Sequence, residues 1–149
     1  MTGDRWFFDT NVLIYLFDTK APDKQATAHN LWDQACRKAA PVLSTQVLQE
    51  FFATVTKTVK QGVPIPKARE AILEFSDIAD IVTISVPLIA TATQRVEVSS
   101  FSFWDSLIIE SAIESGARRL WTEDLQDGQT FGELMVVNPF KSPMEERDA

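Results

Sequence analysis

Short apolar runs alternate along the chain with longer stretches in which apolar residues recur at helical spacing. The apolar runs predict five strands, at residues 5–8, 42–44, 80–85, 118–122 and 134–138. The helically spaced stretches predict helices at residues 11–17, 24–40, 45–61, 67–79, 87–97 and 102–115. Strands that alternate with helices indicate an α/β fold, here one domain with a central, mostly parallel five-stranded sheet flanked by helices.

Four carboxylates lie close to predicted strand ends. Asp9 directly follows the first strand, and Asp124 comes three residues after Trp121 in the fourth. Glu50 lies in the first two turns of the helix after the second strand, and Asp105 lies in the first turn of the helix before the fourth. Sites in parallel sheets lie outside the carboxyl ends of the strands, so we expect these acids to gather at one edge.

Asp9 stands in the run "RWFFDTNVLIYLF", which is otherwise mostly apolar or aromatic. A buried carboxylate costs free energy unless a partner compensates it. Asp9 could form an Asx turn that starts the next helix, for which Asn11 is a plausible N-cap. The apolar surroundings favour a functional role for Asp9 over this turn role.

Asp105 is the clearest candidate by helical position. Ser106, Glu110 and Glu114 share a polar face on a helical wheel, whereas Asp105 falls on the other side, beside Ile108. Ser102 could cap this helix. No Lys or Arg lies within one turn of Asp105, so a metal ion is favoured over a salt bridge.

Glu50, Asp124 and Asp127 give weaker local signals. Glu50 falls outside the apolar stripe of its helix, next to Gln46, as a solvated surface residue would. Asp124 could cap a turn, and Asp127 followed by Gly128 is an ordinary turn signal. Three acids within residues 123–127 nevertheless produce a dense negative field after the fourth strand.

Composition narrows the chemistry of this cluster. The chain has 149 residues, 21 acidic against 14 basic, and a net charge of -7, which argues against a passive nucleic-acid coat. Cys36 and His29 are each the single residue of their type, so no cysteine zinc site is possible. Carboxylates without His or Cys select hard cations such as Mg²⁺ or Mn²⁺, which support phosphodiester hydrolysis.

Basic residues near the helix that carries Glu50 are candidates for contacts with an RNA backbone. Lys57 is expected two helical turns after Glu50 on the same face. Solvated surface positions are the ordinary role of such residues. The predicted set is Lys57, Lys60, Lys67 and Arg69.

Five segments together resemble the PIN-domain ribonucleases, in particular their toxin branch, the VapC-type toxins of toxin–antitoxin pairs. They are "FFDTNVLIY", "STQVLQEF", "FWDSLIIESAIESGA", "LWTEDLQDG" and "VVNPF", and they run in the family's order from residue 7 to residue 140. By this resemblance the four acids Asp9, Glu50, Asp105 and Asp124 match the family's metal-site positions. The matching supporting positions are Asn11, Thr122 and Asp127.

The resemblance implies a PIN-like nuclease domain at residues 1–141. The character of the last residues predicts a flexible tail at 142–149. It further implies a Mg²⁺- or Mn²⁺-dependent endoribonuclease that acts as a toxin, forms a homodimer and is inhibited by a cognate antitoxin. Asp9, Asp105 and Asp124 would ligate the metal, and Glu50 would be a ligand or orient the attacking water.

Two other functions stay open on the sequence. A phosphatase of the haloacid-dehalogenase type also begins with an aspartate after its first strand, but it needs a second acid where this chain has Asn11. A non-catalytic module could use the same acids to bind a basic peptide. An apolar helix surface around Leu31 and Trp32 could serve a dimer or an antitoxin, although a core role is more usual. No signal peptide or membrane-length apolar stretch is found, and we expect a cytoplasmic protein.

Overall fold

The computed structural model describes residues 4–57 and 62–141. Six strands form one sheet in the order β3-β2-β1-β4-β6-β5. Every neighbouring pair is parallel except β5 with β6. The strands are β1 (Arg5–Phe8), β2 (Ala40–Ser44), β3 (Asp80–Val82), β4 (Arg119–Trp121), β5 (Thr130–Phe131) and β6 (Leu134–Val137).

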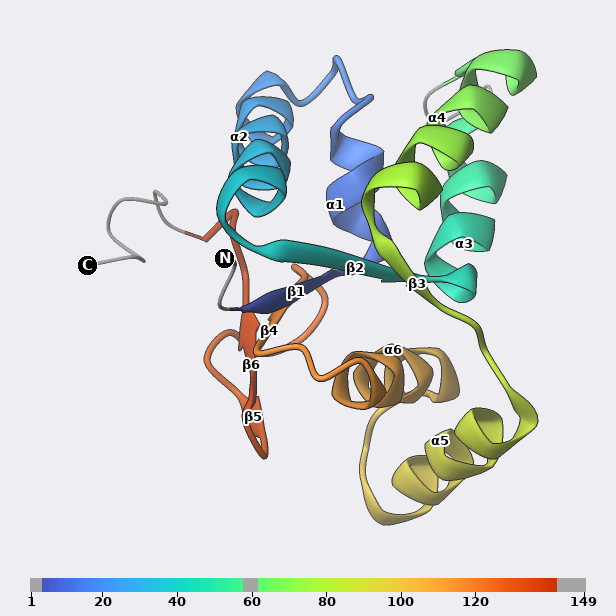
Figure 1. Cartoon of the computed structure of the whole chain (residues 1–149), viewed down its shortest axis with the longest axis vertical. Coiled ribbons are helices and arrows are strands. Elements are labelled where there is room, and N and C mark those ends of the chain that lie inside the picture. Colours follow the sequence, from blue (N-terminus) through green and yellow to red (C-terminus); the bar gives the residue numbers. More distant parts are fainter. Residues whose placement is uncertain (1–3, 58–61, 142–149) are drawn as a thin grey trace.

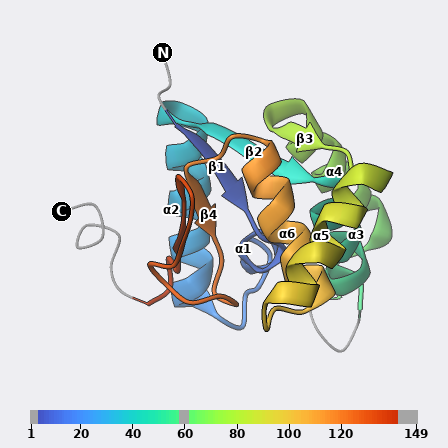
Figure 2. The same ribbon diagram turned by 90° about the horizontal axis from the view of Figure 1, so that it is seen from below.

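Helices cover both faces of this sheet, as the alternating pattern predicts (Figure 1). One layer contains α1 (Thr10–Tyr15), α2 (Pro22–Lys38), α3 (Thr45–Val55) and α4 (Ile65–Ile78). The other contains α6 (Phe103–Glu114), with α5 (Val86–Val98) packed against it on the outside (Figure 2). The predicted α/β class and mostly parallel sheet are therefore confirmed, while the sheet has six strands instead of five.

The strand that the sequence did not predict, β5, has only two residues. It forms a hairpin with β6 in which Thr130 lies opposite Met135 and Phe131 opposite Leu134. Gly132 adopts a positive φ of 63° in the connecting turn, a conformation that glycine reaches without steric cost. Two residues are too few to show a strand period, so no pattern marked this hairpin.

Helix α3 is shorter than the predicted helix at residues 45–61, because it ends at Val55 with Thr56 as its C-cap. The Thr56 hydroxyl donates to the Phe52 carbonyl, 2.7 Å away. Lys57 therefore lies beyond the helix, and the predicted face shared with Glu50 is wrong. Lys60 falls outside the described residues.

The main core extends over both faces of the sheet, because it includes residues of the first helical layer and Ile108, Ile109 and Ala112 of α6. Phe7, Phe8, Phe51 and Trp121 have no exposed surface. Trp32 packs edge-on against Phe8 and Phe75, so the apolar surface of α2 around it serves the core. A separate small cluster of Leu88, Ala92 and Leu107 joins α5 to α6. No helix of the described ranges is long and apolar enough to cross a membrane.

Phe51 offers a test of how α3 is held. Its ring is fully buried and lies 5.6 Å from the Phe17 ring and 5.3 Å from the Phe75 ring, measured between centroids. Phe51→Ala should lower the free energy of unfolding by about 3–5 kcal/mol in urea denaturation, because it leaves a cavity. Leu73→Ala, at a site 59% exposed on α4, is the control and should change it by at most about 0.5 kcal/mol. Similar losses in both variants would contradict this packing.

Candidate active site

The carboxyl ends of β1, β2 and β4 meet at one edge of the sheet. Strand β1 lies between β2 and β4, with Phe8 opposite Trp121 of β4. Asp9 therefore follows the central strand of the three, and its backbone N–H donates to the Trp121 carbonyl at 3.0 Å. Asp9 therefore stands at the edge of the sheet that the strand ends predict.

Asp9 begins α1 as its N-cap, a role the sequence assigned to Asn11. One carboxylate oxygen, Oδ1, accepts from the Thr10 backbone N–H at 2.7 Å. The other, Oδ2, accepts from the Thr122 hydroxyl at 2.8 Å. Asp9 is 5% exposed, so these bonds supply part of the stabilisation that burial removes. Asp9 is both the cap of α1 and the acid at the strand end.

Thr122 links Asp9 to the other polar residues at this edge. Its hydroxyl donates to Asp9 and accepts from the Asn11 amide at 3.2 Å and from the Asp124 backbone N–H at 3.0 Å. A hydroxyl has one donor and two acceptor positions, so all three are used. Asn11 also donates to the Asp124 carboxylate at 3.0 Å. Two of the three predicted supporting residues, Asn11 and Thr122, therefore hydrogen-bond to Asp9 or Asp124.

Glu50 is joined to the same edge by two residues that sequence reasoning missed. The Thr10 hydroxyl donates to Glu50 Oε1 at 2.6 Å, and the Gln46 amide donates to Oε2 at 3.3 Å. Gln46 is 4% exposed and its amide nitrogen also lies 3.3 Å from the Trp104 carbonyl. Glu50 is therefore held on both oxygens and is not a freely solvated surface residue.

Asp105 occupies the first turn of α6, whose N-cap Ser102 accepts from the Asp105 backbone N–H at 3.0 Å. The side chain of Asp105 is half-buried. The opposite, polar face of the helix is also buried, because Ser106 has no exposed surface and Glu110 forms an ion pair with Arg95 of α5. A simple division of α6 into a buried and a solvated face is therefore wrong, although the inward position of Asp105 stands.

Burial raises the pKa of Asp9 and of Asp105, and the charges of Asp124 and Glu50 raise both pKa values further. Burial raises the pKa of Asp9 to about 7, and the charges of Asp124 and Glu50 add to this against the hydrogen bonds from Thr122 and Thr10. Burial, followed by the charge of Asp124, also raises the pKa of Asp105. In the described ranges, no Lys, Arg or His forms an ion pair with any of these four acids.

A divalent cation fits this set of side chains by charge and by donor chemistry. Carboxylate oxygens are the ligands that Mg²⁺ and Mn²⁺ prefer, and the cation would supply the positive charge that the protein does not provide. Among the residues described, no three His, Cys, Asp or Glu side chains are already grouped closely enough to hold an ion. The assignment of individual ligands is therefore part of the proposal below.

Two neighbouring acids have other partners. Asp127 Oδ1 accepts from the Asn138 backbone N–H at 2.8 Å, which fastens the loop after β4 to the end of β6. Glu123 accepts from the Tyr15 hydroxyl at 2.7 Å and from Lys24 at 3.0 Å. Sequence reasoning missed this cluster, because Lys24 lies far from Glu123 along the chain and no local pattern joins them.

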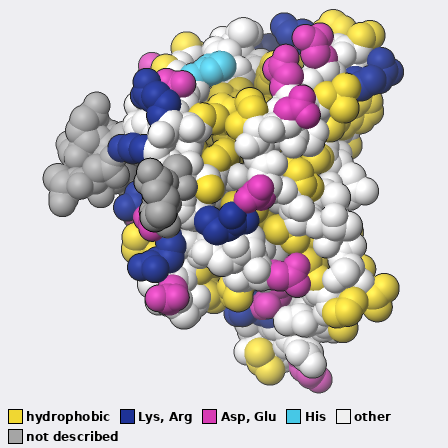
Figure 3. All heavy atoms as spheres, viewed as in Figure 1, with side chains coloured by type: hydrophobic (Ala, Val, Ile, Leu, Met, Phe, Trp, Pro, Cys, Tyr) yellow, Lys and Arg dark blue, Asp and Glu magenta, His cyan; other side chains and the backbone are white. Residues whose placement is uncertain are grey.

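The three predicted RNA-contacting residues that are described are exposed, and no hydrogen bond or ion pair links them to the four acids. Lys67 and Arg69 lie on α4 and Lys57 follows α3. On the face shown in Figure 3, basic side chains are interspersed with acidic ones. Their contact with RNA stays a prediction.

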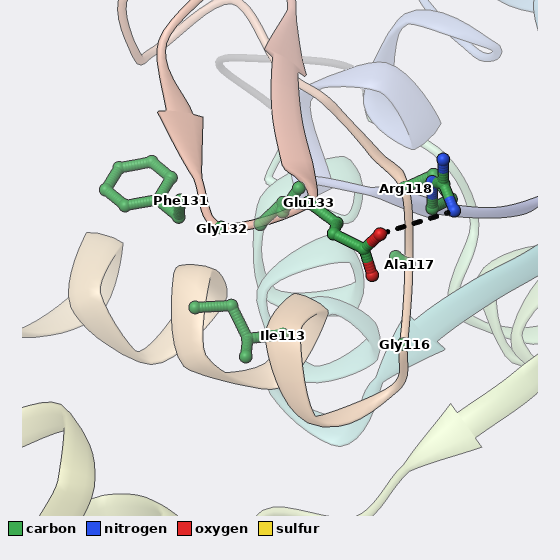
Figure 4. Close-up of a pocket in the computed structure, with 8 residues that line it drawn as sticks. Ile113, Gly116, Ala117, Arg118, Phe131, Gly132 and Glu133 are labelled. Atoms are coloured by element: carbon green, nitrogen blue, oxygen red, sulfur yellow. Dashed lines mark ion pairs between the residues drawn. The ribbon is translucent and has the colours of Figure 1, made fainter.

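A pocket of about 200 Å³ lies at the other end of β4. An ion pair between Arg118 and Glu133, 3.8 Å apart, lies at this pocket (Figure 4). The pocket is formed mainly by the residues before β4 and by the β5–β6 turn, so it lies away from the strand ends that carry the acids. Its lining is Ile113, Gly116, Ala117, Arg118, Phe131, Gly132, Glu133 and Leu134.

Comparison with known families identifies the class. A family model described as the PIN domain matches residues 6–126. The chain therefore belongs to the PIN-domain family, which confirms the resemblance found in its motifs. A search of curated protein sequences gives no significant match.

Solved structures with a similar fold include toxin–antitoxin proteins. VapBC2 from Rickettsia felis, bound to a promoter DNA fragment, is 20% identical, with 89% of this chain and 96% of that chain covered and a TM-score of 0.63. VapBC-1 from nontypeable Haemophilus influenzae is 16% identical, with 92% of this chain and 99% of that chain covered and a TM-score of 0.64. VapC20 from Mycobacterium tuberculosis, a Sarcin-Ricin loop cleaving toxin, is 18% identical, with 77% of this chain and 86% of that chain covered and a TM-score of 0.59. At these identities the likeness establishes the fold.

The raised pKa of Asp9 predicts how stability changes with pH. The folded chain keeps the Asp9 proton up to about pH 7, whereas the ordinary value for the unfolded chain is 3.8. The folded state thus binds more protons between these values, and the free energy of unfolding falls as pH rises, by up to about 4 kcal/mol from Asp9. Urea denaturation in EDTA from pH 4 to 8 measures this slope. Asp9→Ala should flatten it; equal slopes in both proteins would contradict the burial of an ionisable Asp9.

Proposed function

We propose that this protein is a metal-dependent endoribonuclease that acts as the toxin of a toxin–antitoxin pair. The observation that carries the proposal is the group of acids at the sheet edge, which interact electrostatically and have no cationic partner among the described residues. PIN-family membership and the fold shared with VapC20, whose name states that it cleaves the Sarcin-Ricin loop, support RNA as the substrate.

Asp9, Asp105 and Asp124 would hold Mg²⁺ or Mn²⁺, which supplies the charge that draws a phosphate to an acidic site and activates water. Thr122 holds the Asp9 carboxylate and the start of the Asp124 loop in place. Thr10 and Gln46 orient Glu50. The lone pairs of Glu50 that these bonds leave free would bind the metal or accept a hydrogen bond from the attacking water. These bonds preorganise the oxygens before substrate arrives.

Removal of one acid tests this assignment. Asp105→Asn and Asp9→Ala should each lower Mn²⁺-dependent cleavage of RNA at least ~100-fold, as loss of a preorganised electrostatic group does. Glu97→Gln, which changes the net charge as Asp105→Asn does at an exposed position of α5, is the matched control and should retain full activity. Retained activity in rigorously purified Asp105→Asn would defeat the mechanism.

Metal binding supplies a readout that does not depend on activity. A cation that binds only the folded chain stabilises it, so Mn²⁺ should raise the melting temperature of wild type and of Glu97→Gln. The rise should be lost in Asp9→Ala and Asp105→Asn. A binding module without catalysis would show no Mn²⁺-dependent RNA turnover, and this separates it from the nuclease. Asn11, in place of the second acid, counts against the phosphatase.

The basic residues are proposed to contact the RNA backbone. Lys57→Glu combined with Lys67→Glu should weaken RNA binding and reduce the dependence of log K on log salt by about 0.7 for each phosphate of a single strand that the protein no longer neutralises. Lys38→Glu, at the exposed end of α2, is the control and should change neither quantity. Unchanged affinity and slope in the double variant would remove these residues from the interface.

A cognate antitoxin, a homodimer and a cytoplasmic location complete the proposal. They are supported by the fold shared with the VapBC proteins, one of which is described with promoter DNA. Division into a nuclease domain at residues 1–141 and a tail at 142–149 belongs to it as well; the tail lies outside the described residues. A short DNA-binding protein encoded in an adjacent reading frame would support the antitoxin.

A further inference from the structure

Trp104 is exposed in a way that the other tryptophans of the chain are not. It is 60% exposed, whereas Trp6 and Trp121 are at most 5% exposed and Trp32 packs in the core. Trp104 also directly precedes Asp105, so the two Cα atoms are about 3.8 Å apart. A large aromatic surface thus stands in water at the margin of the proposed metal site.

The backbone on either side of this ring is fixed. The Gln46 amide donates to the Trp104 carbonyl, and the same nitrogen donates to Glu50, so one buried side chain ties α6 to α3 at this point. Ser102 accepts from the Asp105 N–H and caps the helix. The Trp104 ring contacts the Phe103 ring at an angle of 74°, with centroids 5.0 Å apart. The Trp104 ring is therefore exposed, while hydrogen bonds hold the backbone that carries it.

We propose that Trp104 is a positioning residue on which a base of the RNA stacks, next to the phosphate held at the acids. The inference rests on the function proposed above and adds a residue to it. The Gln46 amide, which contacts both the Trp104 carbonyl and Glu50, places the residue that carries this ring beside the acids. Aromatic rings bind unpaired bases in this way, because every base has a π face.

The charge of the protein explains why such a stacking platform would be needed. With a net charge of -7, the protein attracts little RNA through its backbone phosphates. Stacking does not depend on charge, so it supplies affinity where electrostatics does not. Its contribution should therefore be nearly independent of salt, which distinguishes it from the contacts proposed for Lys57 and Lys67.

The experiment uses an oligoadenylate RNA decamer and an abasic decamer with the same number of phosphates. Binding is measured by fluorescence anisotropy in EDTA, in an Asp105→Asn parent, so that trace metal does not support cleavage of the probe. Trp104→Ala, Trp104→Phe and Trp104→Leu are added to this parent. Leu73→Ala removes a similarly exposed apolar side chain on α4 and is the matched control.

Trp104→Ala should weaken binding of oligoadenylate by about 5- to 150-fold, the range expected for loss of one base stack. It should leave the abasic decamer unaffected, and the loss should be the same at low and high salt. The affinity of Trp104→Phe for oligoadenylate should lie between those of the parent and Trp104→Ala. Trp104→Leu should bind as weakly as Trp104→Ala, and Leu73→Ala should bind as tightly as the parent. In an active background the loss should appear in KM, with kcat nearly unchanged.

Several results would overturn the inference while leaving the nuclease intact. They are equal binding by Trp104→Ala and the parent, equal losses on both decamers, or full rescue by leucine, which would mean that apolar bulk suffices. A change of oligomeric mass in Trp104→Ala without a change in RNA affinity would assign the ring to a protein interface instead. If the parent binds neither decamer and wild type cleaves no RNA with Mn²⁺, the proposed function itself fails.

Discussion

The buried carboxylate of Asp9 is the constraint on which the rest of the site depends. It terminates β1, caps α1 and, through the Thr122 hydroxyl, connects the ends of β1 and β4. Each of these links fixes a neighbour: Thr10 reaches Glu50, and Asn11 reaches Asp124. Because the apolar strand and helix on either side exclude water, the position of this one side chain is set by the core rather than by solvent.

The same burial makes the edge electrostatically unfavourable in the protein alone. A carboxylate that serves only structure is usually paired with a cation, as Glu110 is with Arg95 and Glu123 is with Lys24. The acids at the strand ends differ from both, since the pKa values of Asp9 and Asp105 rise where those charges meet. Side chains with strongly shifted pKa values are concentrated at functional sites, although ion-pair networks also shift pKa values.

Local pattern was enough to place the acids but not their partners. Asp9 and Asp124 follow strands, and parallel strands bring their carboxyl ends together, so topology alone predicted that they would meet. Asp105 was found because its position on the helix faces apolar neighbours. Thr10 and Gln46 were missed, since each has an ordinary local role and becomes informative only when α1 packs against α3 and the first turn of α6 meets the Gln46 side chain. Lys57 was misplaced for a related reason: the end of α3 depends on a hydroxyl bond at Thr56 that periodicity does not register.

Helix α5 packs on α6 through a small apolar cluster that is distinct from the main core. Leu88 and Ala92 of α5 contact α6, and Arg95 adds its ion pair with Glu110. Helix α6, which carries Asp105, therefore lies between α5 and the sheet. The outer surface of α5, which exposes Val86 and Val98, bears none of the four acids. The architecture divides the molecule into a part whose sequence is constrained by chemistry and a part that can adapt to new surroundings.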